Sequence, residues 1–162
     1  MTDANVLGFI GLGVMGEPMC RNLAKKSAAR TVAYDTRSQP LDALAADGVE
    51  RAASVADVAA RAGTIFVCVP GEPQVRSVCL GPDGLAAHAR RGQTVIDMST
   101  VPVALAREVG AALAANGVAF ADAPVARTAQ AARDGTLSIM VGAEPAVFAR
   151  LRPLLECMGT EI

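Results

Sequence analysis

Three glycines near the start of the chain have the spacing of a phosphate-binding turn. The segment VLGFIGLGVMG spans residues 6–16 and contains Gly11, Gly13 and Gly16 as G-x-G-x-x-G. We expect Gly11 to permit a tight turn, Gly13 to let the backbone approach a pyrophosphate, and Gly16 to let a helix pack closely on a strand. An apolar run precedes the motif and an amphipathic segment follows it. The N–H groups and positive dipole end of a helix would therefore face the phosphates.

An acidic residue roughly 20 residues beyond this turn strengthens the interpretation. Asp35 ends a predicted strand, where its carboxylate can accept both hydroxyls of a ribose. The same charge would repel a 2′-phosphate, which favours NAD over NADP. Arg37 could instead bind that phosphate, or it could be a solvated loop charge. We place Thr36 in the same ribose-binding turn, predict NAD as the cofactor and leave NADP possible.

These residues need a scaffold whose strands end at one edge. Apolar runs alternate with amphipathic segments along the chain, which is typical of a mostly parallel sheet with helices on both faces. The predicted strands are Val6–Ile10, Thr31–Tyr34, Glu50–Ala52, Thr64–Val69, Thr94–Asp97, Val118–Asp122 and Leu137–Val141. The predicted helices are Val14–Ser27, Leu41–Ala46, Val55–Arg61 with Ser54 as its N-cap, Val103–Ala115 and Pro145–Cys157. We expect one doubly wound, Rossmann-type α/β domain over residues 1–162, with one or two antiparallel strands near its C-terminal edge.

The composition disfavours several other classes of function. The net charge is −1, and the aromatic residues are four phenylalanines and one tyrosine, so no nucleic-acid-binding surface is indicated. No stretch approaches the roughly 20 apolar residues of a membrane helix, and nothing resembles a signal peptide. The cysteines at positions 20, 68, 79 and 157 form no C-x-x-C pair, and His88 is the only histidine. We expect reduced, buried cysteines, no metal site and a cytoplasmic location.

Three segments together resemble the β-hydroxyacid dehydrogenases, the family of 3-hydroxyisobutyrate dehydrogenase and tartronate semialdehyde reductase. FIGLGVMGEPMCRNL at residues 9–23 resembles the family's cofactor signature. VIDMSTVPV at residues 95–103 resembles its D-x-S-T element, and FADAPVARTAQAARDGTLSIMVGA at residues 120–143 its substrate-loop signature. The resemblance implies that a hydride passes between a nicotinamide cofactor and a small 3-hydroxy acid or semialdehyde. A nicotinamide dinucleotide and a small carboxylic acid are then the expected partners.

The resemblance also implies roles for individual residues. It places Leu12, Gly13, Val14 and Met15 at the pyrophosphate and ribose, Val69 and Pro70 at the cofactor crevice, Gln74 at the adenosine half, Thr100 near the nicotinamide and Ser99 beside it. Several of these residues end or follow predicted strands, and ligands bind outside the carboxyl ends of strands in such sheets. Ser99 could also be an N-cap for the helix that begins after Pro102, and it could have both roles.

The chain departs from the family pattern in the substrate loop. After D-A-P-V the family usually has Ser-Gly-Gly, which binds the substrate carboxylate, whereas this chain has Ala126, Arg127 and Thr128. Ala126 has no hydroxyl, but Arg127 could bind a carboxylate through two parallel hydrogen bonds and Thr128 could add a hydroxyl. Alternatively, Arg127 faces solvent or pairs with an acidic neighbour such as Asp134. We expect an altered acid substrate rather than lost activity.

The catalytic lysine that the resemblance implies is absent from the chain. In the family it lies in a G-x-x-x-K-x-x-x-N stretch of an all-helical domain that follows, whereas Lys25 and Lys26 both lie in the first predicted helix. We expect no catalytic residue in this chain, weak cofactor binding and little turnover, with Asp122 holding loop geometry. Alternatives are an imine or other carbonyl reductase, or a stand-alone non-catalytic NAD(P)-binding module. Exposed apolar surface could promote a homo-oligomer.

Overall fold

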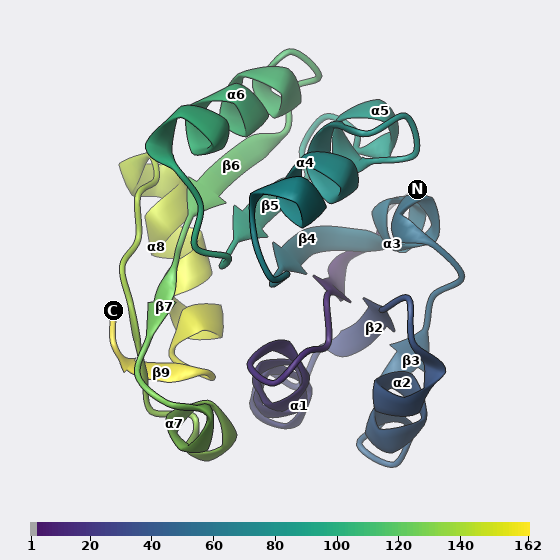
Figure 1. Ribbon diagram of the computed structural model, residues 1–162, viewed down its shortest axis with the longest axis vertical. Helices are drawn as coiled ribbons and strands as arrows, with labels where there is room; N and C mark the ends of the chain where they lie inside the picture. Colours follow the sequence, from purple (N-terminus) through teal and green to yellow (C-terminus); the bar gives the residue numbers. More distant parts are fainter. Residues whose placement is uncertain (1–2) are drawn as a thin grey trace.

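The computed structural model describes residues 3–162, with side chains from residue 5 onward, and is built on a six-stranded parallel sheet (Figure 1). The strands are β1 (Asp3–Ile10), β2 (Arg30–Tyr34), β3 (Glu50–Arg51), β4 (Ala62–Val67), β5 (Thr94–Asp97) and β6 (Ala119–Asp122). Their order is β3-β2-β1-β4-β5-β6, and every neighbouring pair is parallel. The strand order reverses direction at β1, so the doubly wound fold is confirmed and its switch point lies where the glycine turn begins.

Helices cover both faces of the sheet because apolar side chains alternate along the strands. On the face of Leu7 and Phe9 lie α1 (Gly16–Lys26), α2 (Ser38–Ala45) and α8 (Pro145–Leu155). On the face of Val6 and Ile10 lie α3 (Val55–Arg61), α4 (Glu72–Leu80), α5 (Leu85–His88) and α6 (Val103–Ala114). Successive side chains of a strand point to opposite faces, so β1 anchors two separate hydrophobic clusters. Within residues 3–162, no helix has the length and apolar character needed to span a membrane.

A second, small sheet lies at the edge of the domain beside β6 and α8 (Figure 1). It contains β7 (Val125–Ala126), β8 (Leu137–Ile139) and β9 (Gly159–Glu161), and α7 (Ala129–Asp134) connects β7 to β8. β7 and β8 are antiparallel, β8 and β9 are parallel, and an antiparallel bridge between Asp122 and Gly142 joins this unit to the end of β6. The expected antiparallel strand near the C-terminal edge is therefore confirmed.

Several predicted boundaries are wrong by a few residues, and three helices were not predicted. α1 begins at Gly16 rather than Val14, because the two residues before Gly16 belong to the glycine turn. β4 ends at Val67 rather than Val69, because the Val69 N–H donates to a side chain and not to a neighbouring strand. β8 is shorter than predicted because its continuation turns to pair with β6. The helices missing from the prediction are α4, α5 and α7.

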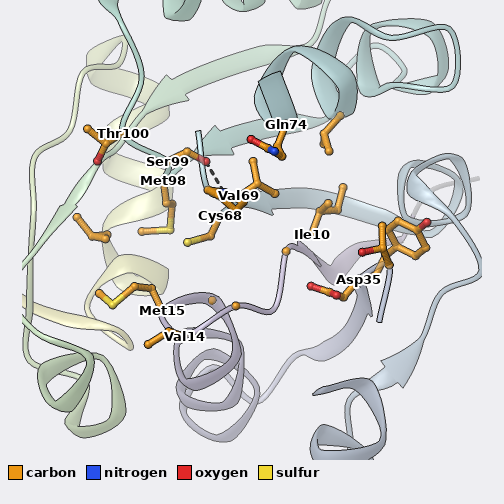
Figure 2. Close-up of a pocket in the computed structure, with 18 of the residues that line it drawn as sticks. Ile10, Val14, Met15, Asp35, Cys68, Val69, Gln74, Met98, Ser99 and Thr100 are labelled. Carbon is orange, nitrogen blue, oxygen red and sulfur yellow. Dashed lines mark hydrogen bonds between the residues drawn. The ribbon is translucent and has the colours of Figure 1, made fainter. Parts of the chain in front are cut away.

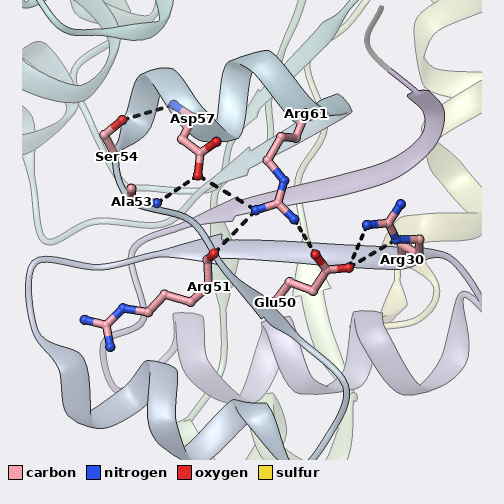
Figure 3. A network of polar contacts seen from close by, with 7 residues as sticks. All are labelled: Arg30, Glu50, Arg51, Ala53, Ser54, Asp57 and Arg61. Atoms are coloured by element: carbon pink, nitrogen blue, oxygen red, sulfur yellow. Dashed lines mark hydrogen bonds and ion pairs between the residues drawn. The ribbon is translucent and has the colours of Figure 1, made fainter.

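Charged side chains border the short edge strand β3 (Figure 3). Glu50 accepts hydrogen bonds from Arg30 at 2.8 and 3.1 Å, and its other carboxylate oxygen pairs with Arg61. The hydrogen bond from Arg30, more than any other contact, lowers the pKa of Glu50. Next to this network, the Ser54 hydroxyl accepts from the Asp57 N–H at 3.0 Å, which confirms Ser54 as the N-cap of α3. A two-residue edge strand surrounded by ion pairs is a poor template for pairing with another chain.

Gln93 is a buried polar residue that joins three elements at the opposite end of the sheet from the glycine turn. Its side chain is 1% exposed, and its amide donates to the Ala59 carbonyl at 2.7 Å and the Ala62 carbonyl at 2.6 Å. Its side-chain oxygen accepts from the Arg90 N–H. These bonds tie the end of α3 and the start of β4 to the residue that precedes β5.

Replacing Gln93 by leucine should therefore destabilise the domain. Gln93→Leu leaves buried backbone groups without partners, and we expect the free energy of unfolding to fall by about 2–4 kcal/mol. The matched control is Gln39→Leu at an exposed position of α2, which should change it by less than about 0.5 kcal/mol. Urea unfolding of the two variants measures the difference, and equal stabilities would contradict this role for Gln93.

Candidate functional site

Backbone hydrogen bonds continue past the strand ends and hold the carboxyl edge of the sheet together. The N–H of Gly11 donates to the Tyr34 carbonyl (3.0 Å), Cys68 to Ile10 (2.8 Å), Met98 to Val67 (2.8 Å) and Ala123 to Asp97 (2.7 Å). Each of these bonds fixes the first residues of a loop against the neighbouring strand. The loops after β1, β4, β5 and β6 therefore leave the sheet from positions that are set relative to one another.

These loops enclose a crevice of about 820 Å³ that runs along the carboxyl edge (Figure 2). The predicted site residues that line it are Gly11, Gly13, Val14, Met15, Gly16, Asp35, Thr36, Arg37, Val69, Pro70, Gln74, Ser99, Thr100 and Arg127. Figure 2 shows Asp35 at one end, Ser99 and Thr100 toward the other, and Val14 and Met15 across the crevice from Ser99 and Thr100. Small-molecule and cofactor sites have volumes of roughly 300–1,000 Å³, so the crevice has the size of a ligand site.

Sequence reasoning missed seven other residues that line the crevice. They are Ile10, Tyr34, Cys68, Ser77, Val78, Met98 and Val125. Most of them adjoin a predicted site residue at the end of a strand, so extending each predicted site by one residue finds them. Ser77 and Val78 follow Gln74 by one helical turn, and they were missed because α4 was not predicted.

The three glycines of the turn meet different steric requirements. Gly11 has a φ of +94°, and a Cβ there would lie 2.1 Å from the Cys68 carbonyl oxygen. A Cβ at Gly16 would lie 2.0 Å from the Gly11 carbonyl oxygen, where α1 starts against the turn. At Gly13 a Cβ would meet no atom within 4 Å. Gly11 and Gly16 are therefore required by the fold itself, whereas Gly13 keeps space open in the crevice.

Asp35 is held at the crevice by the turn and by Arg37. Its Oδ2 accepts from the Leu12 N–H at 2.7 Å, and its Oδ1 accepts from the backbone N–H and the Nε of Arg37 at 2.8 and 3.1 Å. A second guanidinium nitrogen of Arg37 donates to the Leu12 carbonyl at 3.0 Å. Burial alone would raise the pKa of Asp35, but the hydrogen bonds from Arg37 and Leu12 outweigh it and lower the pKa. The residue is therefore ionised at neutral pH.

Leu12 itself is placed differently from the prediction. Its side chain is 1% exposed and packs in the hydrophobic cluster on the α1 face, and it does not line the crevice. Only its backbone serves the site, because it binds Asp35 and Arg37. A contact of Leu12 with the pyrophosphate stays a prediction, and the burial of its side chain limits that contact to the backbone.

At the other end of the crevice, Ser99 connects β5 to the loop after β4. Its hydroxyl accepts from the Val69 N–H at 3.0 Å, so it does not cap α6, whose N-cap is Pro102 without a side-chain hydrogen bond. The Asp97 Oδ1 accepts from the Ser99 N–H at 2.9 Å, and burial raises the pKa of Asp97. Among the described residues no hydrogen-bond partner faces the Asp97 Oδ2. Thr100 is exposed at the rim.

The residues predicted to bind the substrate after D-A-P-V are divided between the crevice and the small sheet. Ala126 pairs with Ser138 of β8 and does not line the crevice. Thr128 is the N-cap of α7, since its hydroxyl accepts from the Ala131 N–H at 3.2 Å. Of the three residues that depart from the family pattern, only Arg127 lines the crevice, and the substrate contacts of Ala126 and Thr128 stay predictions.

Arg127 is paired, but not with the predicted neighbour. Its guanidinium forms an ion pair with Glu161 of β9 and donates to the Thr136 carbonyl at 3.1 Å. Asp134 accepts from Gln130 on its own helix instead. The small sheet brings Glu161 close although it is distant in sequence, whereas Asp134 lies at the far end of α7.

The cysteines are free thiols, and three of them are buried as expected. Cys68 differs, because it is half-buried at the crevice, where burial raises the pKa of its thiol to about 12. It is therefore protonated at neutral pH and a poor nucleophile. Within residues 3–162, no group of three or more histidine, cysteine or acidic residues is arranged to hold a metal ion.

Helix α1 also holds the end of α7 in place. The Asn22 side chain donates to the carbonyls of Ala132 and Arg133 at the end of α7, at 2.9 and 3.0 Å. Lys26 donates to the Cys157 carbonyl at 3.1 Å. The helix that begins at the glycine turn is thus fixed against the unit that carries Arg127.

Comparisons with known proteins agree with this geometry. The family model of the NAD binding domain of 6-phosphogluconate dehydrogenase matches residues 6–162. The 3-hydroxyisobutyrate dehydrogenase of Pseudomonas aeruginosa is 39% identical over 162 residues, which are 100% of this chain and 53% of that protein. The 2-hydroxy-3-oxopropionate reductase of Escherichia coli (strain K12) is 38% identical over 156 residues, 96% of this chain and 53% of that protein.

A solved structure, Psf3 in complex with NADP+ and 2-OPP, has a TM-score of 0.90 at 32% identity and covers 96% of this chain and 55% of that one. The chain spans about half the length of the curated relatives it matches. The resemblance found in its motifs is confirmed, and the chain belongs to the family of the NAD-binding domain of 6-phosphogluconate dehydrogenase.

Proposed function

We propose that this chain binds a nicotinamide dinucleotide along the carboxyl edge of its large sheet. We further propose that it is the cofactor-binding half of an oxidoreductase that transfers a hydride between the nicotinamide and a small 3-hydroxy acid or semialdehyde. The observation that carries the proposal is one crevice lined both by the glycine turn and by an ionised aspartate at the end of β2. Turn and carboxylate are the groups that bind a pyrophosphate and a ribose.

The residues of the crevice fit the parts of the cofactor in order. Asp35 accepts from the adenosine ribose, and Gln74 on α4, which also lines the crevice, is proposed to contact the adenosine half. The pyrophosphate lies over the open space at Gly13, where α1 begins with no side chain capping its first N–H groups. The nicotinamide lies toward Ser99 and Thr100. When bound it supplies the hydride acceptor or donor, and the chain orients it and excludes water.

Asp35 supports NAD as the preferred cofactor. A 2′-phosphate would approach an ionised carboxylate that the structure holds rigidly through Leu12. Arg37 has the opposite effect and favours NADP, because its exposed guanidinium lies beside Asp35 and can turn toward such a phosphate. We therefore expect NADP to bind, with a lower affinity than NAD.

We propose that the proton donor of the reaction comes from outside the described crevice. Neither lysine is among the lining residues, and Lys26 is engaged with the Cys157 carbonyl. Asp122 exchanges backbone hydrogen bonds with Gly142 at 3.0 and 2.7 Å, which supports a structural role. We propose that the half of the enzyme corresponding to the rest of the relatives supplies this acid. No observation favours an imine reductase or a stand-alone binding module over this proposal.

Calorimetric titration with NADH and NADPH tests the proposed cofactor. We expect NADH to bind more tightly, and Asp35→Asn to weaken NADH binding by about 10- to 100-fold, as the loss of a charge-assisted hydrogen bond does. The control is Asp134→Asn, outside the crevice, which should leave both affinities unchanged. Because the pKa of Asp35 is lowered, its charge persists above that pKa, and NAD+ affinity should be equal at pH 5.5 and 7.5. No binding of either cofactor would refute the proposal.

Alanine at Gly13 should weaken NADH binding with little effect on stability, whereas alanine at Gly16 should destabilise the domain. Gly13→Ala meets no atom in the free protein, so the free energy of unfolding should change by less than about 0.5 kcal/mol. Its methyl group would occupy the space of the pyrophosphate, and NADH affinity should fall at least tenfold. Gly16→Ala collides with backbone and should cost about 1–3 kcal/mol of stability. Thermal unfolding and NADH titration separate these effects, and full NADH binding by Gly13→Ala would count against the assignment.

A further inference from the structure

We propose that Glu161 is a positioning residue that competes with the substrate for Arg127. In the absence of substrate it holds the guanidinium by an ion pair, and a small carboxylate that enters the crevice takes over that guanidinium. The inference rests on the proposed function and identifies the group that selects acidic substrates at the far end of the cofactor crevice.

The two arginines that line the crevice lie at opposite ends of it. Arg37 follows β2 and is bound to Asp35, whereas Arg127 follows β7 beyond the end of β6. In the sheet order the ends of β1, β4 and β5 separate these two positions. Arg127 therefore supplies positive charge on the side of Ser99 and Thr100, where the nicotinamide is proposed to lie and where a substrate has to meet it.

The backbone at Arg127 is strained in a way that points to function. Its φ is +90°, a conformation that favours glycine and that few other residues adopt. The pairing of Ala126 with β8 and the capping of α7 by Thr128 hold the chain on both sides of it. A non-glycine residue kept in such a conformation by its surroundings is typical of a functional site. Here the constrained backbone holds the Cα of Arg127 at the crevice, so its side chain starts from a defined position.

A substrate carboxylate can replace Glu161 as the partner of the Arg127 guanidinium. The side chains of Arg127 and Glu161 are 41% and 60% exposed, and ion pairs in water are weak and easily replaced. A substrate carboxylate can offer the guanidinium two parallel hydrogen bonds, and the displaced Glu161 carboxylate, which is exposed, is then solvated by water. The hydrogen bond to the Thr136 carbonyl uses a different guanidinium nitrogen, so it can persist during the exchange.

The test is an NMR titration of the whole chain with 3-hydroxypropionate, repeated with its neutral amide, in the presence and absence of NADH. Glu161→Gln removes the competitor and should tighten 3-hydroxypropionate binding about two- to fivefold, with no change for the amide. Glu161→Asp keeps the charge and should return the affinity toward the wild-type value. A gain of affinity distinguishes competition from a structural role, because damage to the small sheet would only weaken binding.

Arg127→Gly is the second variant, because glycine accepts the observed φ. Its stability should equal or exceed that of the wild type, while its affinity for 3-hydroxypropionate falls at least tenfold. Arg133→Ala on α7, which removes a guanidinium that donates to the Gln130 side chain, is the matched control and should bind as the wild type does. Unchanged or weaker carboxylate binding by Glu161→Gln, full binding by Arg127→Gly, or no binding by the wild type would overturn the inference. Failure of NADH alone to bind would refute the proposed function instead.

Discussion

The contact between the turn after β1 and the end of β4 is the constraint on which the site depends. The Gly11 N–H is bonded to the end of β2 and the Ile10 carbonyl to the Cys68 N–H, so the turn is clamped between two strands. A single methyl group at Gly11 would overlap the Cys68 carbonyl. This close approach directs the chain into α1 with its first N–H groups toward the crevice, and it places Leu12 where its backbone can hold Asp35.

The two ends of the crevice carry opposite charges, which suits the proposed cofactor and its proposed acidic substrate. At the β2 end, an aspartate is kept ionised by backbone and guanidinium hydrogen bonds. At the β6 end, an arginine is held by an exposed glutamate. Between them lie backbone amides and mostly apolar side chains such as Val69 and Met98. Both ends therefore hold a charged group in an ion pair, while backbone amides and apolar side chains line the middle.

The sequence predicted the large sheet and most of the crevice, because both depend on local signals. Apolar runs and the glycine spacing indicated β1, α1 and the parallel order, and Asp35 and Ser99 could be placed at strand ends. Helix α4 was not predicted, because only Val75 and Cys79 of its residues are buried and the apolar pattern of a helix is therefore weak. Glu161 could not be identified as the partner of Arg127, because that contact depends on how β9 packs beside β8. Asp134 was the nearer acid in sequence, but its side chain is engaged within α7.

The most direct measurement is a crystal structure of the chain with NADH. We expect electron density for the pyrophosphate over Gly13 and the start of α1, with the adenosine ribose on Asp35. A cofactor bound elsewhere, with the glycine turn unchanged and Asp35 making no contact with the ribose, would contradict this binding mode.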